Sequence, residues 1–209
     1  MPRRPRHALS GVAFHVMNRA VRGTDLFRVH RDFEAFAEIT TEGLKRARSR
    51  VRIISFEVMS NHWHEVITCD RIADLSAFMH WTQGTHANRW AGAHRARGRG
   101  YVYQGRFKAV PVQTSTSLIR VCRYVERNAL RRNLVSAAEH WPWGSLYARC
   151  NNCDAIRFHP GQFRNLTIGS NLSMPLRQMR NSPICESGYD VISRSATPTG
   201  WSTSRRFLA

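Results

Sequence analysis

The sequence has few acidic residues, few cysteines and no long apolar run, and each of these shortages excludes a class of protein. Fourteen Asp and Glu stand against thirty-two Lys and Arg in 209 residues, which leaves a net charge of +18. No stretch approaches the roughly 18 apolar residues that a membrane span needs. The five cysteines are odd in number and scattered, which argues against a disulfide framework and favours a reducing compartment.

The N-terminus also lacks the apolar run of a secretory signal, so we expect a cytoplasmic, nucleoid-associated protein. Nearly all of the positive excess is arginine, whose planar guanidinium matches phosphate oxygens and stacks on bases. Nucleic acid is therefore the expected partner. A membrane surface is not the expected partner, because no basic amphipathic helix with a broad apolar face is evident. A glycine-rich phosphate loop is missing as well.

Composition divides the chain into three parts. Residues 1–10 form a basic arm in which Arg3, Arg4 and Arg6 are candidate phosphate contacts. Residues 11–149 carry the periodic patterns of a folded domain. Residues 150–209 are rich in Asn, Ser, Pro and Arg and have little periodicity, so we predict a poorly ordered extension there.

The spacing of apolar residues predicts the elements of the folded part. Alternation indicates strands at 12–18, in two β-branched runs that meet at residues 59–61, and at 101–113, where Gly105 marks a bend. Helical spacing predicts helices over 32–50, 75–94 and 115–133. The last of these has a core stripe made of Leu118, Cys122, Val125 and Ala129.

The second β-branched run contains His62-Trp63-His64. Side chains alternate across a strand, so both imidazoles point to one face, and Trp63 and Glu65 point to the other. Two neutral imidazoles on a rigid strand suit a divalent metal if a third ligand comes from elsewhere. While the motif stands alone, a pair of half-buried strand histidines is the better interpretation. His15 could face the same side, but a lone strand histidine is more often structural, and we assign it no role.

Four further motifs follow a consistent order along the chain. They are Phe14-His-Val-Met-Asn-Arg19, Tyr103-Gln-Gly-Arg-Phe-Lys108, Arg123-Tyr124-Val-Glu-Arg-Asn128 and Trp141-Pro-Trp143-Gly-Ser145. Together with Asn61-His62-Trp63-His64, they make residues 1 to about 148 resemble the REP-associated tyrosine transposases. These belong to the single-tyrosine HUH transposases of bacterial insertion sequences.

The resemblance implies that His62 and His64 are metal ligands, that Tyr124 is the nucleophile and that Asn128 is the third ligand, with Mg²⁺ or Mn²⁺ as cofactor. It implies an α+β fold, a ferredoxin-like antiparallel sheet with helices packed on one face (the HUH palm), with the catalytic domain at residues 11–149. The family cuts single-stranded DNA beside a hairpin and leaves a 5′-phosphotyrosine and a free 3′-hydroxyl. We expect a monomer or a homodimer that binds single-stranded or hairpin DNA.

A phenol with a pKa of ~10 is a poor nucleophile at neutral pH unless a nearby cation favours the phenolate. The metal, or the arginines that share the helix with Tyr124, could supply that charge. Elsewhere, Arg106 and Lys108 could grip phosphates, although a solvated basic strand explains them equally well. The candidate DNA contacts of the folded part are therefore Arg106, Lys108, Arg120, Arg123 and Arg127.

Two positions depart from the family pattern. Glu65 stands where an aliphatic residue is usual, and on the face away from the histidines it must be solvated or paired, for example with an arginine. Ala129 replaces a frequent proline, which should only make helix 115–133 continue more smoothly.

Three functions remain open at this point. The first is a DNA transposase that cleaves and rejoins single strands. The second is a catalytically retired DNA- or RNA-binding protein derived from such a transposase, which Glu65 and the unusual extension favour. The third is a metal-dependent nuclease that uses water instead of Tyr124.

Overall fold

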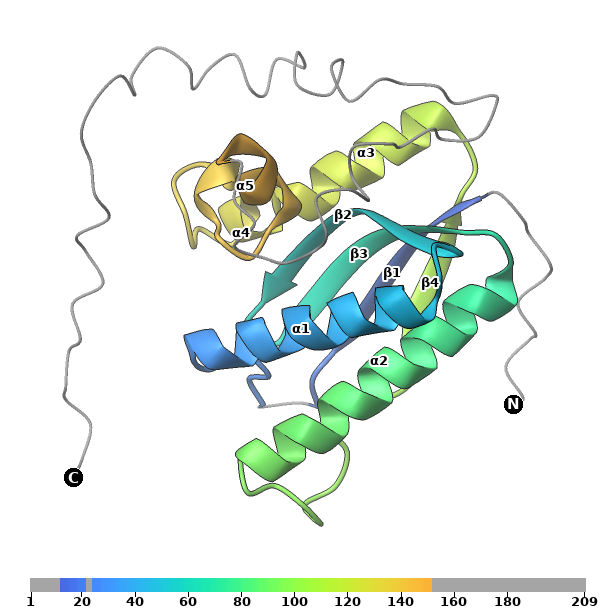
Figure 1. Ribbon diagram of the computed structural model, residues 1–209. Coiled ribbons are helices and arrows are strands. Elements are labelled where there is room, and N and C mark those ends of the chain that lie inside the picture. The colour runs from blue at the N-terminus through green and yellow to red at the C-terminus, as the bar shows by residue number, and fades with distance from the viewer. Residues whose placement is uncertain (1–11, 22–23, 152–209) are drawn as a thin grey trace.

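The computed structural model describes residues 12–21 and 24–151 (Figure 1). The predicted basic arm and the extension from residue 152 onward lie outside the described residues. The strands β1 (Ala13–Arg19), β2 (Val51–Met59), β3 (His62–Cys69) and β4 (Lys108–Val112) form one antiparallel sheet with the order β2-β3-β1-β4. The two β-branched runs are β2 and β3, joined by a two-residue turn at Ser60 and Asn61.

Two long helices cover one face of this sheet. Helix α1 (His30–Arg46) follows β1, and helix α2 (Ile72–Ala93) follows β3, as Figure 1 shows. The order β1-α1-β2-β3-α2-β4, with both crossover helices on one face, is the ferredoxin-like arrangement. The predicted α+β fold is therefore confirmed.

The opposite face is covered by the segment that follows β4. Helix α3 (Ser115–Glu126) packs Leu118, Cys122 and Val125 against the sheet. Helix α4 (Asn128–Arg131), a 3₁₀ turn (Ala138–His140) and helix α5 (Ser145–Cys150) complete this layer. The expectation of helices on one face thus holds for α1 and α2 only, because the apolar stripe of α3 requires a sheet face of its own.

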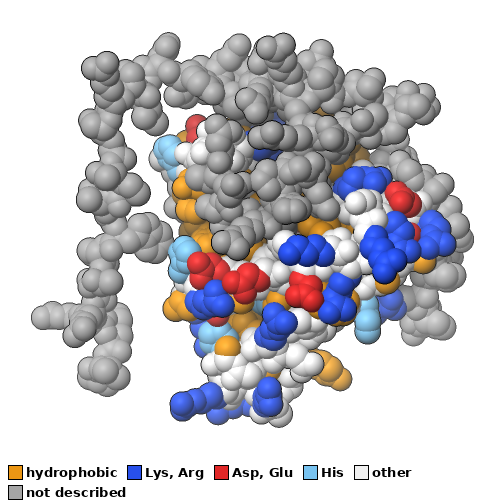
Figure 2. Space-filling view, in the orientation of Figure 1, with side chains coloured by type: hydrophobic (Ala, Val, Ile, Leu, Met, Phe, Trp, Pro, Cys, Tyr) orange, Lys and Arg blue, Asp and Glu red, His pale blue; other side chains and the backbone are white. Residues whose placement is uncertain are grey.

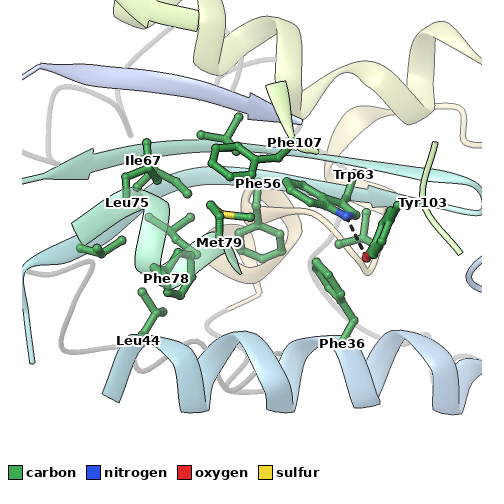
Figure 3. Close-up of a cluster of buried hydrophobic side chains, with 14 of the residues drawn as sticks. Phe36, Leu44, Phe56, Trp63, Ile67, Leu75, Phe78, Met79, Tyr103 and Phe107 are labelled. Atoms are coloured by element: carbon green, nitrogen blue, oxygen red, sulfur yellow. Dashed lines mark hydrogen bonds between the residues drawn. The ribbon is translucent and has the colours of Figure 1, made fainter. Parts of the chain in front are cut away.

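The main core lies between the sheet and the pair α1 and α2 (Figure 3). Trp63 is fully buried there, and its Nε1 donates a hydrogen bond to the Tyr103 hydroxyl at 3.3 Å. That hydroxyl lies 2.8 Å from Nδ1 of His86 on α2. Burial lowers the pKa of His86 to about 4, so this ring is neutral. The indole, the phenol and the imidazole therefore form one buried polar chain.

Glu65 lies in the same core, which corrects the expectation that it would be solvated or paired. It is only 1% exposed, and its Oε2 has no hydrogen-bond partner among the described residues. Strand alternation forces it onto the Trp63 side, where the helices exclude water. Burial raises the pKa of the Glu65 carboxyl to about 8.

The predicted helix 115–133 is wrong at one point, because it is broken at Arg127, between α3 and α4. The backbone N–H of Ala129 donates to Oε1 of Glu57 on β2 instead of continuing the helical ladder. A buried carboxyl group therefore accepts a backbone N–H at the start of α4, and replacing the family's proline by alanine does not restore a continuous helix.

The segment 101–113 is a strand only over β4. Before it, Tyr103 forms an isolated bridge with Ala20, and the Gly105 carbonyl accepts a hydrogen bond from Nδ2 of Asn18. None of the helices in the described part of the chain is long and apolar enough to cross a membrane.

Candidate active site

His62 and His64 point to the face of the sheet that α3 and α4 cover, opposite Trp63. Both side chains are buried, at 7% exposure each, and their ring centroids lie 5.2 Å apart with perpendicular planes. Because both rings come from one strand, their spacing is fixed by the backbone of β3 rather than by mobile loops.

Both imidazoles are neutral at physiological pH. Burial lowers the pKa of His62 to about 4, helped by the positive charges of Arg19 and Arg132. Burial also lowers the pKa of His64 to about 3, with smaller contributions from His15, His62 and Arg19. Each ring therefore retains a lone pair that can bind a cation.

The ring orientations are set by two neighbours. Nδ1 of His62 lies 2.7 Å from Oδ1 of Asn61, and an amide oxygen only accepts, so this nitrogen carries the hydrogen and Nε2 keeps its lone pair. Nδ1 of His64 lies 3.0 Å from Nε2 of His15 on β1. The structure thus brings His15, to which the sequence assigned no role, into direct contact with the pair.

Tyr124 lies on α3 beside these rings. Its centroid is 6.0 Å from that of His64 and 6.0 Å from that of His15, and the residue is 43% exposed. The guanidinium of Arg131 lies over the phenol ring, 4.8 Å from its centroid. A cation at this position packs on the face of the aromatic ring and holds it in place.

Helix α3 is fastened to the sheet two residues after Tyr124. Oε1 of Glu126 accepts hydrogen bonds from Ser55 on β2, at 2.9 Å, and from Ser145 on α5, at 2.7 Å. Arg149 pairs with the same oxygen. Ser145 belongs to the Trp141-Pro-Trp143-Gly-Ser145 motif, so one role of that motif is to anchor the helix that carries Tyr124.

Asn128, the first residue of α4, is buried at 7% exposure. Its position follows from Glu57, which stands opposite His64 in the β2–β3 register and accepts the N–H of Ala129. Burial raises the pKa of the Glu57 carboxyl to about 8, a nearby Glu126 adds to the rise, and the hydrogen bond from Ala129 opposes it. Tyr124 and Asn128 are therefore carried by two separately anchored helices.

The basic residues predicted to contact DNA are on the surface wherever the structure describes them. All five in the folded part are exposed, whereas Arg3, Arg4 and Arg6 lie outside the described residues. The five are Arg106, Lys108, Arg120, Arg123 and Arg127. The sequence analysis missed Arg19 and Arg132, whose positive charges lower the pKa of His62. It also missed Arg131, whose guanidinium lies over the ring of Tyr124.

Some of the missed residues left a signal in the sequence. A two-residue turn at 60–61 pairs position 57 with position 64, so Glu57 could have been placed beside His64. Arg131 follows Tyr124 by seven residues, or two helical turns, although the break at Arg127 makes that count unreliable. For His15, strand alternation indicated the correct face, but nothing in the sequence indicated its contact with His64.

Acidic side chains collect on the other side of the molecule. Figure 2 shows acidic and basic side chains interspersed over α1. Arg31 pairs there with Glu34 at 3.3 Å and with Glu38 at 3.1 Å. On α3 and α4, by contrast, the only acidic residue is Glu126, which is engaged in its own network. The side of the molecule formed by α3 and α4, which we call the histidine face because these helices cover His62 and His64, is therefore predominantly basic.

The family of the chain follows from a comparison of sequences. A protein-family model described as "Transposase IS200 like" matches residues 8–128, which is more than half of the chain. The chain therefore belongs to the IS200-like transposases, and the resemblance drawn from the motifs is confirmed at the level of the family. No curated protein matches the chain by sequence.

Comparison with solved structures finds one with the same fold. The structure of a REP-associated tyrosine transposase bound to a REP hairpin has a TM-score of 0.55 and 12% sequence identity, over 81% of this chain and 97% of that one. A candidate transposase from Deinococcus radiodurans R1 has a TM-score of 0.40 and 14% identity, over 61% of this chain and 95% of its own. At 12% identity, the similarity to the REP-associated tyrosine transposase supports the fold alone.

Proposed function

We propose that this transposase cleaves and rejoins single-stranded DNA at hairpin-flanked sites through a covalent link to Tyr124. The observation that carries the proposal is the position of Tyr124, whose exposed phenol ring lies 6.0 Å from the buried, neutral ring of His64. A nucleophile beside metal-binding imidazoles is the arrangement that phosphodiester transfer requires.

Cleavage and rejoining of the DNA strand need no external energy source, because one phosphorus–oxygen bond is exchanged for another. The phenolate oxygen of Tyr124 attacks the phosphorus, a phosphorus–oxygen bond to tyrosine forms, and the bond to the 3′-oxygen breaks. The released 3′-oxygen takes up a proton and becomes a hydroxyl, while the 5′-phosphate stays on Tyr124. Attack by a 3′-hydroxyl reverses these events. Arg131, over the phenol ring, would hold the nucleophile in position for this attack.

The donors present fit Mg²⁺ or Mn²⁺ in number and kind. No group of three His, Cys, Asp or Glu able to hold a metal occurs among residues 12–21 and 24–151, so His62 and His64 need a third ligand of another type. The amide oxygen of Asn128, buried at the start of α4, would be that ligand. When bound, the ion would neutralise charge on the non-bridging phosphate oxygens.

Single-stranded or hairpin DNA is the partner that we propose, and the basic histidine face is where it would lie. Binding should weaken steeply with salt, at a slope of roughly −0.7 per phosphate contact in a double-logarithmic plot. Arg19→Gln should reduce the slope by about 0.7, because it removes one cation beside His62 and His64. Fluorescence anisotropy over a salt series measures both values.

Arg31→Gln is the matched control for this measurement. Arg31 is an exposed arginine on α1, on the other side of the sheet, and it already pairs with Glu34 and Glu38. Its loss should leave the slope unchanged. Equal effects of the two substitutions would argue that DNA is not held on the histidine face.

The chemistry is tested by incubating the full chain with a single-stranded hairpin oligonucleotide and Mn²⁺, followed by denaturing electrophoresis. We expect a protein–DNA adduct that resists denaturation and disappears after protease treatment. Hairpin binding without an adduct, with either Mg²⁺ or Mn²⁺, would instead assign the chain to retired, DNA-binding descendants of the family.

A further inference from the structure

His15 meets His64 edge to edge. Its Nε2 lies 3.0 Å from Nδ1 of His64, while the ring centroids are 5.1 Å apart and the planes differ by 28°. A centroid separation so much larger than the nitrogen–nitrogen distance means that the rings face each other through these two nitrogens. This is the geometry of a hydrogen bond in which one ring donates N–H and the other accepts.

The sheet places His15 where it can serve this role. His15 stands opposite Val66 in the register of β1 and β3, and Met17 stands opposite His64, so His15 is the diagonal neighbour of His64 on the same face. Its ring also lies 6.0 Å from that of Tyr124.

A neutral imidazole has a single N–H. If Nε2 of His64 is to give its lone pair to a metal ion, Nδ1 must carry the hydrogen and requires an acceptor. Asn61 provides that acceptor for His62, through its Oδ1. We propose that His15 provides it for His64 and is a positioning residue, holding Nε2 of His64 in the orientation and tautomer that bind the metal. This proposal rests on the metal-dependent function proposed above.

The first test needs neither metal nor DNA. Nitrogen-15 NMR of the imidazoles in the metal-free full chain should place the His64 hydrogen on Nδ1. In His15→Phe, which keeps an aromatic ring but has no acceptor, the hydrogen should move to Nε2. In His15→Gln, whose side-chain oxygen restores an acceptor, it should remain on Nδ1. Met17→Leu, a change on the same strand face directly opposite His64, is the matched control and should behave as the unaltered protein.

The second test measures Mn²⁺ affinity by calorimetry. His15→Phe should bind Mn²⁺ about 10- to 100-fold more weakly, which is the usual effect of removing such a partner. His15→Gln should recover most of the affinity, and Met17→Leu should lose none. Raising the Mn²⁺ concentration should restore cleavage by His15→Phe, because the metal ligands themselves are intact.

Three results would overturn the proposal. One is a His64 hydrogen on Nε2 in the unaltered protein. The second is an equal loss of Mn²⁺ affinity in His15→Gln and His15→Phe, since acceptor capacity would then be irrelevant. The third is a loss of cleavage at unchanged Mn²⁺ affinity, which would link His15 to Tyr124. An unaltered protein that has the expected tautomer and binds Mn²⁺ but forms no adduct would refute the transposase chemistry and leave the assignment of His15 in place.

Discussion

Tyr124→Phe should bind hairpin DNA and Mn²⁺ as the unaltered protein does, and should form no covalent adduct. The substitution removes one hydroxyl from a residue that is 43% exposed, and Arg131 can still pack over the ring. Cleavage should fall by at least about a thousandfold, because the attacking atom itself is lost. Single-turnover cleavage of a labelled oligonucleotide, with adduct detection, measures the effect.

His64→Ala is the informative comparison for this variant. It should also abolish cleavage, but through weaker Mn²⁺ binding, since one of two buried imidazoles is removed. The two variants should therefore share the loss of product and differ in calorimetric metal affinity. If Tyr124→Phe continued to cut DNA, the tyrosine would be structural and water would be the nucleophile.

Glu65→Leu should stabilise the protein by about 3 kcal/mol at pH 7. The carboxyl is buried, its Oε2 has no partner in the part of the chain that the structure describes, and its pKa is about 8 in the folded state against an ordinary 4.5. Keeping it protonated from pH 4.5 to pH 7 costs about 1.4 kcal/mol for each pH unit. For a chain of this size, the gain corresponds to a rise in Tm of roughly 6–12 °C. Urea unfolding of both proteins at pH 7 measures it.

The pH dependence separates this explanation from better packing alone. A raised carboxyl pKa means that the folded state binds the proton up to about pH 8, while the unfolded chain releases it near 4.5. The free energy of unfolding should therefore decrease as pH rises through this window. Glu65→Gln, of the same size but without a charge, should make that decrease smaller by about 1.4 kcal/mol per pH unit. An unchanged slope in Glu65→Gln would mean that the carboxyl is hydrated in solution.

The sequence predicted those parts of the fold that depend on local periodicity. The β2–β3 hairpin, the opposite faces of Trp63 and His64 and the buried stripe of α3 all follow from alternation or helical spacing. Recognition of the motifs added the ferredoxin-like topology, which periodicity alone does not specify.

The features that were wrong or missed depend on contacts between distant segments. The break at Arg127 results from Glu57, 70 positions earlier, capturing the N–H of Ala129. Glu65 was expected to be solvated or paired, but α1 and α2 together exclude water from its position. The contact between His15 and His64 depends on the pairing of β1 with β3, and these two residues are 49 positions apart in the sequence. None of these partners is visible in a local window of sequence.

The uneven distribution of charge has a kinetic consequence. Because the ion pairs of α1 neutralise one another while Glu126 is the one acid of α3 and α4, the described part of the molecule carries more uncompensated positive charge over α3 and α4 than over α1. A polyanion approaching from solution would turn the molecule before contact, so that a larger share of collisions begins with the histidine face toward the strand. We therefore expect a high association rate constant for DNA at low ionic strength. Added salt should lower this rate constant by a larger factor than it changes the dissociation rate constant.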